Sequence, residues 1–198
     1  PRMTKTRGPL HTLFDHSVPR LYPHVCQALR QYTEPGGITL EIGCGGMQYR
    51  PFVRGRHLGI DLQSGLYGGA GPELIGDARA LPLPDGSVDT VFVVAALLDI
   101  DGWQMVMTEA GRVLRAGGRF LVFDYKGRVA RRLGSPNLFT AARLLCGMES
   151  AGLIGEHHLE FLPVHRIGPL RNRWVCRLVA PLIYLVSNWL IVSGSKPR

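Results

Sequence analysis

The stretch Ile-Thr-Leu-Glu-Ile-Gly-Cys-Gly-Gly, at residues 38–46, decides the fold. Its first five residues are mainly apolar or β-branched, which predicts a short strand. The glycines that follow allow the backbone to turn tightly and to approach a ligand without a Cβ atom in the way. We therefore predict a strand at 38–42, a ligand-binding turn at 43–46 and a short helix after the turn.

Short apolar runs alternate with helical patterns along most of the chain. Further strands are predicted at residues 57–60, 73–76, 88–94, 119–123, 156–164 and 188–193. Helices are predicted at residues 18–32, 102–114 and 136–152. Gly117-Gly118 is expected to break the chain before the fifth strand. This alternation implies parallel strands joined by crossover helices in a doubly wound α/β sheet, which binds ligands at the carboxyl ends of its strands.

The composition predicts one globular domain in a reducing compartment. The 198 residues are 45% hydrophobic and 19% charged, which is ordinary for a folded domain. The four cysteines are widely spaced, without a CxxC pair or a histidine cluster at zinc spacing, so we expect reduced thiols and no metal site. The first residues show no apolar secretion signal, and a cytoplasmic protein is the expectation.

The net charge of +8 is unevenly distributed. Residues 119–198 hold 12 Lys and Arg against 4 Asp and Glu, so this part carries the whole excess. The asymmetry indicates either a localised anionic partner or a solvated basic face, and the pattern alone leaves both open.

The residues around the turn indicate which class of nucleotide the turn would bind. A nicotinamide-dinucleotide fingerprint requires a third glycine at position 48, where the chain has Gln48. The second strand ends at Asp61, 18 residues beyond Gly43. A carboxylate there either accepts both hydroxyls of an adenosine ribose or caps the next turn.

Five segments in succession resemble the motifs of class I S-adenosylmethionine-dependent methyltransferases, most closely the type 11 group. They are Leu-Glu-Ile-Gly-Cys-Gly at 40–45, Gly-Ile-Asp at 59–61, Gly-Asp-Ala with Leu-Pro-Leu at 76–83, Asp-Gly-Ser-Val-Asp-Thr-Val at 85–91, and Glu-Ala-Gly-Arg-Val-Leu-Arg-Ala-Gly-Gly-Arg at 109–119. The resemblance implies a Rossmann-like, seven-stranded, mostly parallel sheet with helices on both faces and an antiparallel last strand. It also implies a methyltransferase of the EC 2.1.1 class that uses S-adenosylmethionine.

The same resemblance implies a set of cofactor-binding residues. Glu41 would fix the glycine loop near the amino-acid part of the cofactor, Asp61 would hold the ribose hydroxyls, and Asp77 would meet the adenine edge. The full set is Glu41, Gly43, Cys44, Gly45, Asp61, Leu62, Asp77, Ala78 and Ala95. Residues 95–98 would border the sulfonium and the acceptor. The chain departs from the family at Met47, where the loop usually carries a third glycine.

No residue is singled out as a catalytic base. Methyl transfer from a sulfonium is an in-line displacement, in which positioning and desolvation supply much of the rate and a base is needed only for a protonated nucleophile. The candidates that reach the acceptor side are His16 and His24 in the N-terminal segment, Asp99 and Asp101 after the fourth strand, and Asp124 and Tyr125 after the fifth. Each also has an ordinary surface or packing role open to it.

The acceptor side is expected to involve both ends of the chain. Residues 1–35 are predicted to form an N-terminal helix or lid, and 36–198 the methyltransferase domain with a basic and apolar insertion at about 165–186. Two basic clusters follow the fifth and sixth strands: Lys126, Arg128, Arg131 and Arg132, and Arg166, Arg171, Arg173 and Arg177.

The insertion suggests what the acceptor is. Arg171, Arg173, Trp174 and Arg177 lead into the apolar run 178–186, which resembles either an interfacial membrane element or a core helix with a charged first turn. We predict a methyltransferase for a small-molecule or lipid-like acceptor, cytoplasmic or peripheral to an anionic membrane. The alternatives are an RNA methyltransferase and a non-catalytic partner protein with the same fold.

Overall fold

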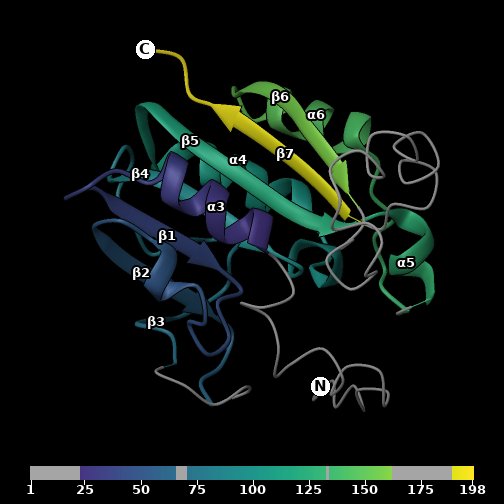
Figure 1. Cartoon of the computed structure of the whole chain (residues 1–198), viewed down its shortest axis with the longest axis horizontal. Helices are drawn as coiled ribbons and strands as arrows, with labels where there is room; N and C mark the ends of the chain where they lie inside the picture. The colour runs from purple at the N-terminus through teal and green to yellow at the C-terminus, as the bar shows by residue number, and fades with distance from the viewer. Residues whose placement is uncertain (1–22, 66–70, 133, 162–188) are drawn as a thin grey trace, which may run out of the picture.

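The computed structural model describes residues 23–65, 71–132, 134–161 and 189–198. The strands are β1 (Ile38–Ile42), β2 (Arg56–Asp61), β3 (Leu74–Ile75), β4 (Val88–Val94), β5 (Leu114–Tyr125), β6 (Ile154–Phe161) and β7 (Trp189–Ser195). They form one sheet in the order β3-β2-β1-β4-β5-β7-β6 (Figure 1). β7 is antiparallel to both of its neighbours, and the other described pairs are parallel. The predicted fold class is confirmed.

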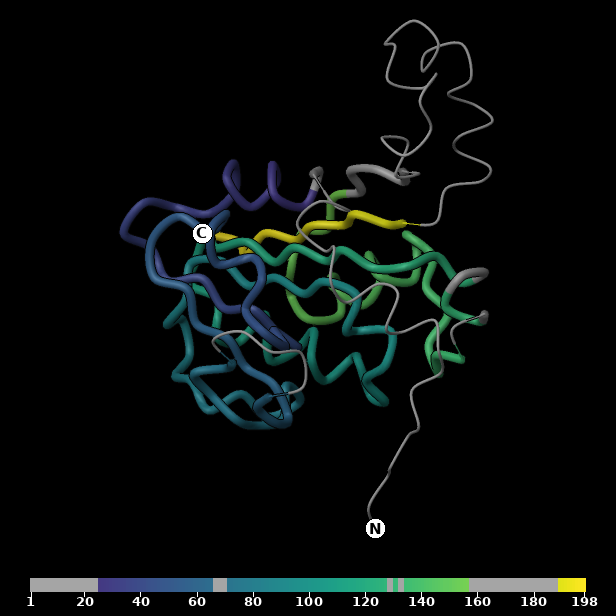
Figure 2. Tube along the Cα trace, turned by 60° about the horizontal axis from the view of Figure 1, so that its bottom comes forward, coloured from purple at the N-terminus to yellow at the C-terminus, as the bar shows by residue number. Residues whose placement is uncertain are grey.

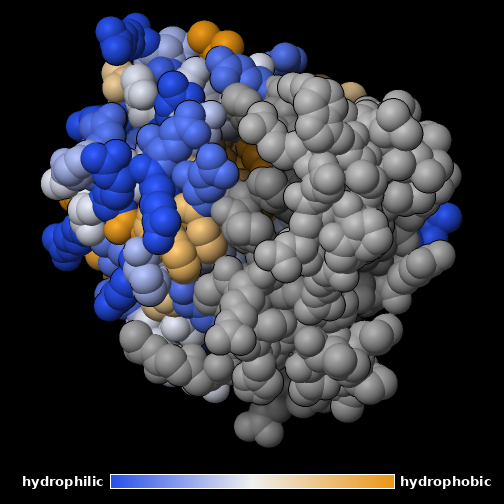
Figure 3. Space-filling model, viewed as in Figure 1, coloured by the Kyte–Doolittle hydropathy of each residue, from blue (hydrophilic) through white to orange (hydrophobic). Residues whose placement is uncertain are grey.

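Helices cover both faces of this sheet. They are α3 (Pro23–Tyr32), α4 (Trp103–Val113), α5 (Gly127–Arg132) and α6 (Ala141–Ser150), with 3-10 turns η1 (Arg50–Phe52) and η2 (Leu97–Asp99). α3 lies on one face, and α4 and α6 lie on the other (Figure 2). The described surface on the α3 side is mainly hydrophilic (Figure 3), because α3 buries Val25 and Leu29 and exposes Arg30.

The core follows from the spacing of apolar residues. On α4, Val106, Met107 and Ala110 recur at helical spacing and are fully buried. On the central strands, Leu40 and Val91 are fully buried as well. Each such aliphatic side chain contributes about 1.5–3 kcal/mol when it leaves water. Val91, Phe92 and Val93 are successive and fully buried, so both faces of β4 are covered, which explains why this strand is a continuous apolar run.

The short helix predicted after the glycine loop is wrong. The chain passes through successive turns from Gly43 and then into the single 3-10 turn η1. Gly45 and Met47 have φ angles of 52° and 57°, which belong to the left-handed region and interrupt an α-helix. Pro51 then removes a backbone donor.

The break predicted at Gly117-Gly118 is also wrong, because β5 begins at Leu114 and continues to Tyr125. The register with β4 shifts between Val88 and Thr90, so the extra residues form a bulge within the strand. Gly117 has a φ angle of 76°, a conformation that glycine adopts readily. The helix predicted at 136–152 begins later, at Ala141, because the Thr140 side chain caps it by accepting from the Arg143 N–H at 3.2 Å.

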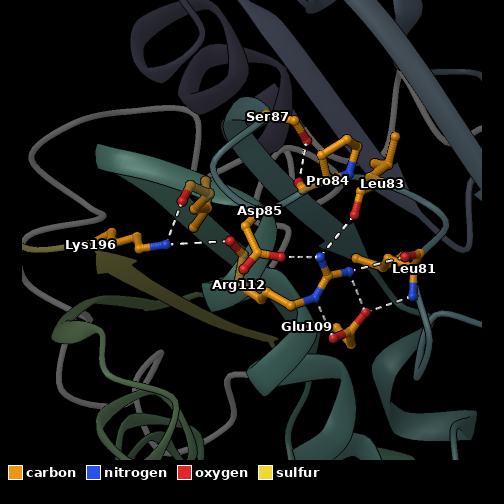
Figure 4. Close-up of polar contacts among 9 residues, drawn as sticks. Leu81, Leu83, Pro84, Asp85, Ser87, Glu109, Arg112 and Lys196 are labelled. Atoms are coloured by element: carbon orange, nitrogen blue, oxygen red, sulfur yellow. Dashed lines mark hydrogen bonds and ion pairs between the residues drawn. The ribbon is translucent and has the colours of Figure 1, made fainter.

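A network around Arg112 fastens α4 to the loop before β4 (Figure 4). The Arg112 guanidinium donates to Oε1 of Glu109 at 2.7 Å, to Oδ1 of Asp85 at 2.6 Å and to the carbonyl of Leu83 at 2.8 Å. Nζ of Lys196 donates to the carbonyl of Leu114 at 2.7 Å. The last residues of the chain are thereby tied to the beginning of β5.

Candidate cofactor site and acceptor edge

The glycine loop lies at the carboxyl ends of β1 and β4, where the sheet order reverses. Gly43 has a φ angle of 67°, and its N–H donates to the carbonyl of Ile60 at 2.9 Å. A Cβ atom on Gly43 would lie 2.5 Å from Cβ of Ala96, so the loop after β1 can meet the loop after β4 only with glycine here. This is the crevice in which open α/β sheets bind ligands.

Met47 occupies the left-handed position at which the related motif has glycine. Its side chain is 3% exposed, and its sulfur fills the space that a side chain on Gly59 would need. A Cβ atom on Gly59 would lie 2.1 Å from Sδ of Met47 and 2.6 Å from Sγ of Cys44. The departure at Met47 is therefore matched by a glycine on β2, and buried packing offsets the strained backbone.

Asp61 ends β2 directly beside the glycine loop. Its Oδ2 atom accepts from the N–H of Gly45 at 2.9 Å, and its Oδ1 atom accepts from the N–H of Leu62 at 2.8 Å. Each carboxylate oxygen has a second lone pair, so Asp61 can also accept from the two hydroxyls of a ribose. Leu62 and Ile75, at the ends of β2 and β3, are 70% and 65% exposed. Exposed apolar side chains beside a carboxylate suit a nucleoside.

Asp77 follows β3 and is bound by Arg79. The Arg79 guanidinium donates to Oδ2 of Asp77 at 2.6 Å, and these bonds lower the pKa of the carboxyl group. The same guanidinium donates to the carbonyl of Asp101 at 3.2 Å. Arg79 therefore links the carboxylate expected at the adenine to the loop after β4. No motif marked Arg79, because only the folded chain brings residues 77 and 101 together.

Glu41 is buried beneath the glycine loop, on the α3 face of the sheet. Burial raises the pKa of Glu41 well above its usual value, and the nearby Asp61 acts in the same direction. His57 of β2 lies against it, with Nε2 3.0 Å from Oε2 of Glu41. The sequence signal for Glu41 was its place in the motif, whereas His57 had no signal of its own.

The loop after β4 is held by two buried polar side chains. Asp124, at the end of β5, accepts from the N–H groups of Leu98 at 3.0 Å and of Tyr125 at 2.7 Å. Asn137 donates through Nδ2 to the carbonyls of Leu98 at 3.2 Å and of Ile100 at 2.8 Å. Burial raises the pKa of Asp124 well above its usual value. Asp124 thus shapes the wall of the site, and Asn137 carried no sequence signal for doing so.

Of the described candidates for a catalytic base, Asp99 and Asp124 lie near each other at the loop after β4. Asp99 is exposed and accepts from Oγ of Ser135 at 3.0 Å, and Asp101 is also exposed. His24 lies in the first turn of α3, but its side chain lies outside the described residues, as does all of His16. A role as base stays a prediction for each of them.

The first basic cluster lies at the carboxyl edge of the sheet. Lys126 follows β5, and Arg128, Arg131 and Arg132 belong to α5, which was not predicted. The predicted lid is described only from Pro23 onward. The second cluster lies outside the described residues, with Arg166, Arg171, Arg173, Trp174 and Arg177.

The boundaries of the predicted insertion lie at the same edge. Tyr125 at the end of β5 pairs with Trp189, which also pairs with Phe161 at the end of β6. The connection 162–188 therefore leaves and rejoins the sheet beside the end of β5. Within the residues that the structure describes, every helix falls short of the length and apolar character that crossing a bilayer demands.

Known proteins resemble this chain in sequence and in fold. Residues 40–122 match the model of a methyltransferase domain family. A fatty-acid O-methyltransferase of Mycolicibacterium smegmatis is 38% identical over 106 residues, which cover 47% of this chain and 39% of the relative. A ubiquinone/menaquinone biosynthesis C-methyltransferase of Caulobacter sp. (strain K31) is 34% identical over 73 residues, covering 35% and 29%. The matches thus span less than two fifths of these relatives.

The fold has a counterpart among solved structures. Haemonchus contortus phosphoethanolamine N-methyltransferase 2, solved with phosphomonomethylethanolamine and S-adenosylhomocysteine, superposes with a TM-score of 0.66 at 16% identity. The superposition covers 88% of this chain and 53% of that one. Residues 40–122 thus match a methyltransferase domain, and the fold is that of solved S-adenosylmethionine-dependent methyltransferases. The cofactor of this class is S-adenosylmethionine.

Proposed function

We propose that this chain transfers a methyl group from S-adenosylmethionine to a small, lipid-like acceptor at the carboxyl edge of β4 and β5. The observation that carries the proposal is the order of three carboxylates around the left-handed glycine loop. Glu41, Asp61 and Asp77 lie at or just beyond the ends of β1, β2 and β3, which are neighbours in the sheet. Together they suit the methionine, ribose and adenine parts of one extended ligand.

The residues of the site supply binding and orientation. The bound cofactor brings the electrophilic methyl group. Asp61 accepts from the ribose hydroxyls, and Asp77 with the backbone of Ala78 meets the adenine. Ala95, half-buried directly after β4, would border the sulfonium, where an apolar surface helps to exclude water. Such positioning supplies much of the rate for an in-line displacement, even without a dedicated base.

Two observations support a lipid-like acceptor. The relatives named above are a fatty-acid and a ubiquinone/menaquinone biosynthesis methyltransferase. The basic residues of α5 follow β5 at the edge where the acceptor would enter. A carboxylate or phosphate on an otherwise apolar acceptor would suit this combination.

Calorimetric titration with S-adenosylmethionine and with S-adenosylhomocysteine tests the cofactor half of the proposal. Micromolar binding of both is expected for such a site, about 8 kcal/mol of binding free energy. A folded chain that binds neither ligand would overturn the proposal and favour the non-catalytic partner protein.

Transfer of a labelled methyl group tests the acceptor half. Fatty acids and quinone precursors are offered beside transfer and ribosomal RNA, and the expected label enters the lipid fraction. Label in RNA would replace the proposal with the RNA methyltransferase. Flotation with anionic vesicles tests the peripheral membrane role, which we assign to Arg171, Arg173 and Arg177. Replacing all three with Ala should abolish flotation, and flotation that persists would remove this role.

A further inference from the structure

Two buried ionisable side chains lie together beneath the glycine loop, and the proposed function uses only one of them. Glu41 of β1 and His57 of β2 are each 3% exposed. Glu41 is opposite Gly59 in the parallel register, so His57 lies two residues earlier on the same face of the sheet. The absence of a side chain at Gly59 lets Cys44 and Met47 pack down over the pair.

The surroundings of the pair are poor in compensating charge. The His57 ring lies 5.5 Å from the ring of Phe92, centroid to centroid. β4 presents Phe92 at this level, opposite Glu41, and the α3 residues buried on this side, Val25 and Leu29, are apolar. The titratable groups that face the pair are Cys44 and Tyr49 from the loop above, Arg50 from η1 and Asp61 from the end of β2.

The polar atoms of the pair have unused hydrogen-bonding capacity. Within the described part of the chain, Oε2 of Glu41 and both ring nitrogens of His57 are buried without a hydrogen bond. The 3.0 Å contact between Nε2 and Oε2 is within hydrogen-bond range and lacks only the alignment, which a small side-chain rotation supplies. Since an unsatisfied buried polar atom is destabilising, sharing one proton stabilises both groups.

We propose that His57 is a positioning residue for Glu41, and that the proton shared by the two side chains is released when the cationic cofactor binds. This inference rests on the proposed function, because it takes Glu41 to lie near the methionine part of S-adenosylmethionine. The pair then makes cofactor affinity depend on pH.

The direction of the pH dependence follows from the burial of the pair. Burial, together with Arg50, lowers the pKa of His57 to about 4, whereas burial raises that of Glu41. Both shifts place the shared proton on Glu41 and leave the imidazole neutral. The sulfonium and ammonium groups of the cofactor favour the carboxylate form, so one proton leaves to solvent. The neutral imidazole then donates from Nε2 to the carboxylate and holds it in place.

The experiment measures cofactor affinity by calorimetry between about pH 5.5 and 9, in pairs of buffers that differ in ionisation enthalpy. For the wild type, affinity for S-adenosylmethionine should rise about tenfold per pH unit below the midpoint and level off above it, with close to one proton released. S-adenosylhomocysteine, which lacks the sulfonium charge, should release less.

Three variants separate positioning from packing. His57→Leu removes the donor, and the midpoint should move upward by about one unit, so that affinity below the midpoint falls about tenfold. His57→Gln keeps an N–H donor and should restore the wild-type profile. Thr39→Val alters the residue opposite His57 without touching Glu41, and it should also follow the wild type. A His57→Leu variant that melts cooperatively and keeps the wild-type profile would overturn the inference.

Nitrogen-15 spectra of the ligand-free chain test the pair without the cofactor. The His57 imidazole should stay neutral down to about pH 4, and its tautomer should change in Glu41→Leu, which removes the partner of Nε2 altogether. An unchanged tautomer would overturn the sharing of a proton. If the wild type binds no cofactor at any pH, the proposed function fails instead, and these spectra still decide whether the pair exists.

Discussion

The amino edge of the sheet is held by ion pairs, whereas the carboxyl edge combines ion pairs, such as that of Arg79 with Asp77, with strained backbone and with carboxylates that bind backbone N–H groups. At the amino edge, Arg115 pairs with Glu34 and Asp89, and Arg112 is bound by Glu109 and Asp85. Among the described residues, the positive φ angles outside glycine belong to Met47 and Ala95, and both lie at the carboxyl edge.

This difference separates two tasks within one sheet. Ion pairs that satisfy one another contribute to stability and leave little capacity for a ligand. Strained residues and carboxylates with spare lone pairs cost stability, and they persist where the surrounding packing imposes them. We therefore expect substitutions at the carboxyl edge to change binding first, and those at the amino edge to change stability first.

The largest effect is expected from Asp61→Ala. The variant loses two hydrogen bonds from ribose hydroxyls to a charged acceptor, each worth about 1.5–3 kcal/mol, so affinity for S-adenosylmethionine should fall at least about 100-fold. Calorimetry measures the loss. Asp85→Ala, at the amino edge, is the matched control and should bind like the wild type. Equal losses of affinity in the two variants would contradict the proposal that the carboxyl edge governs binding and the amino edge governs stability.

At acid pH, the buried His57 should lower the free energy of unfolding. The pKa of this group is about 4 in the folded chain against an unfolded value of 6.5, so the unfolded chain takes up the proton first as pH falls. His57 should therefore remove roughly 3 kcal/mol of stability between about pH 7 and 4. The raised pKa of Glu41 acts in the opposite direction, so the comparison is made with His57→Gln.

Urea unfolding of both proteins at a series of pH values isolates the His57 contribution. His57→Gln should gain stability relative to the wild type as pH falls. A stability difference that stays constant from pH 7 to 4 would show that the imidazole is not held neutral in the folded chain.

Arg112→Ala should lower the free energy of unfolding by about 2 kcal/mol, because it leaves the partly buried Glu109 carboxylate and two loop carbonyls without their donor. Affinity for S-adenosylmethionine should change less than about threefold. Arg56→Ala, an exposed arginine at the start of β2, provides the control for removing a positive charge. A loss of affinity as large as that of Asp61→Ala would mean that the amino edge also governs the site.

The smallest expected effect is a difference in stability between two substitutions of Met47. Met47→Ala and Met47→Gly both remove the packing over Gly59, and both should destabilise the fold. Because φ is 57° at this position, the glycine variant should be the more stable of the two by about 1 kcal/mol. Urea unfolding compares them directly. An alanine variant equal to or more stable than the glycine variant would show that the left-handed conformation carries no strain.

The strands and the glycine loop were predictable because their signals are local. Ile38–Ile42 and Val88–Val94 are continuous apolar or β-branched runs, and the structure has strands with these bounds. The extent of β5 was not predictable, because the bulge at Gly117 depends on pairing with Val88 and Thr90 of β4. The sequence of a glycine pair does not distinguish a turn that ends a strand from a β-bulge within it.

The candidate site was predictable only where a motif marks it. Glu41, Asp61 and Asp77 follow strands in a familiar order, so their positions could be inferred. His57, Arg79 and Asn137 act through partners 16 to 40 residues away. Their contacts are set by strand register and loop packing, which no local pattern encodes.

The closeness of Phe161 and Trp189 has an evolutionary consequence. A connection whose two ends are neighbours in a sheet can lengthen or shorten without moving either strand. Residues 162–188 are therefore a position where natural variation can replace one segment by another while the methyl-donor half keeps its geometry. Under the proposed function, we expect chimaeras made at these two residues to exchange acceptors between relatives.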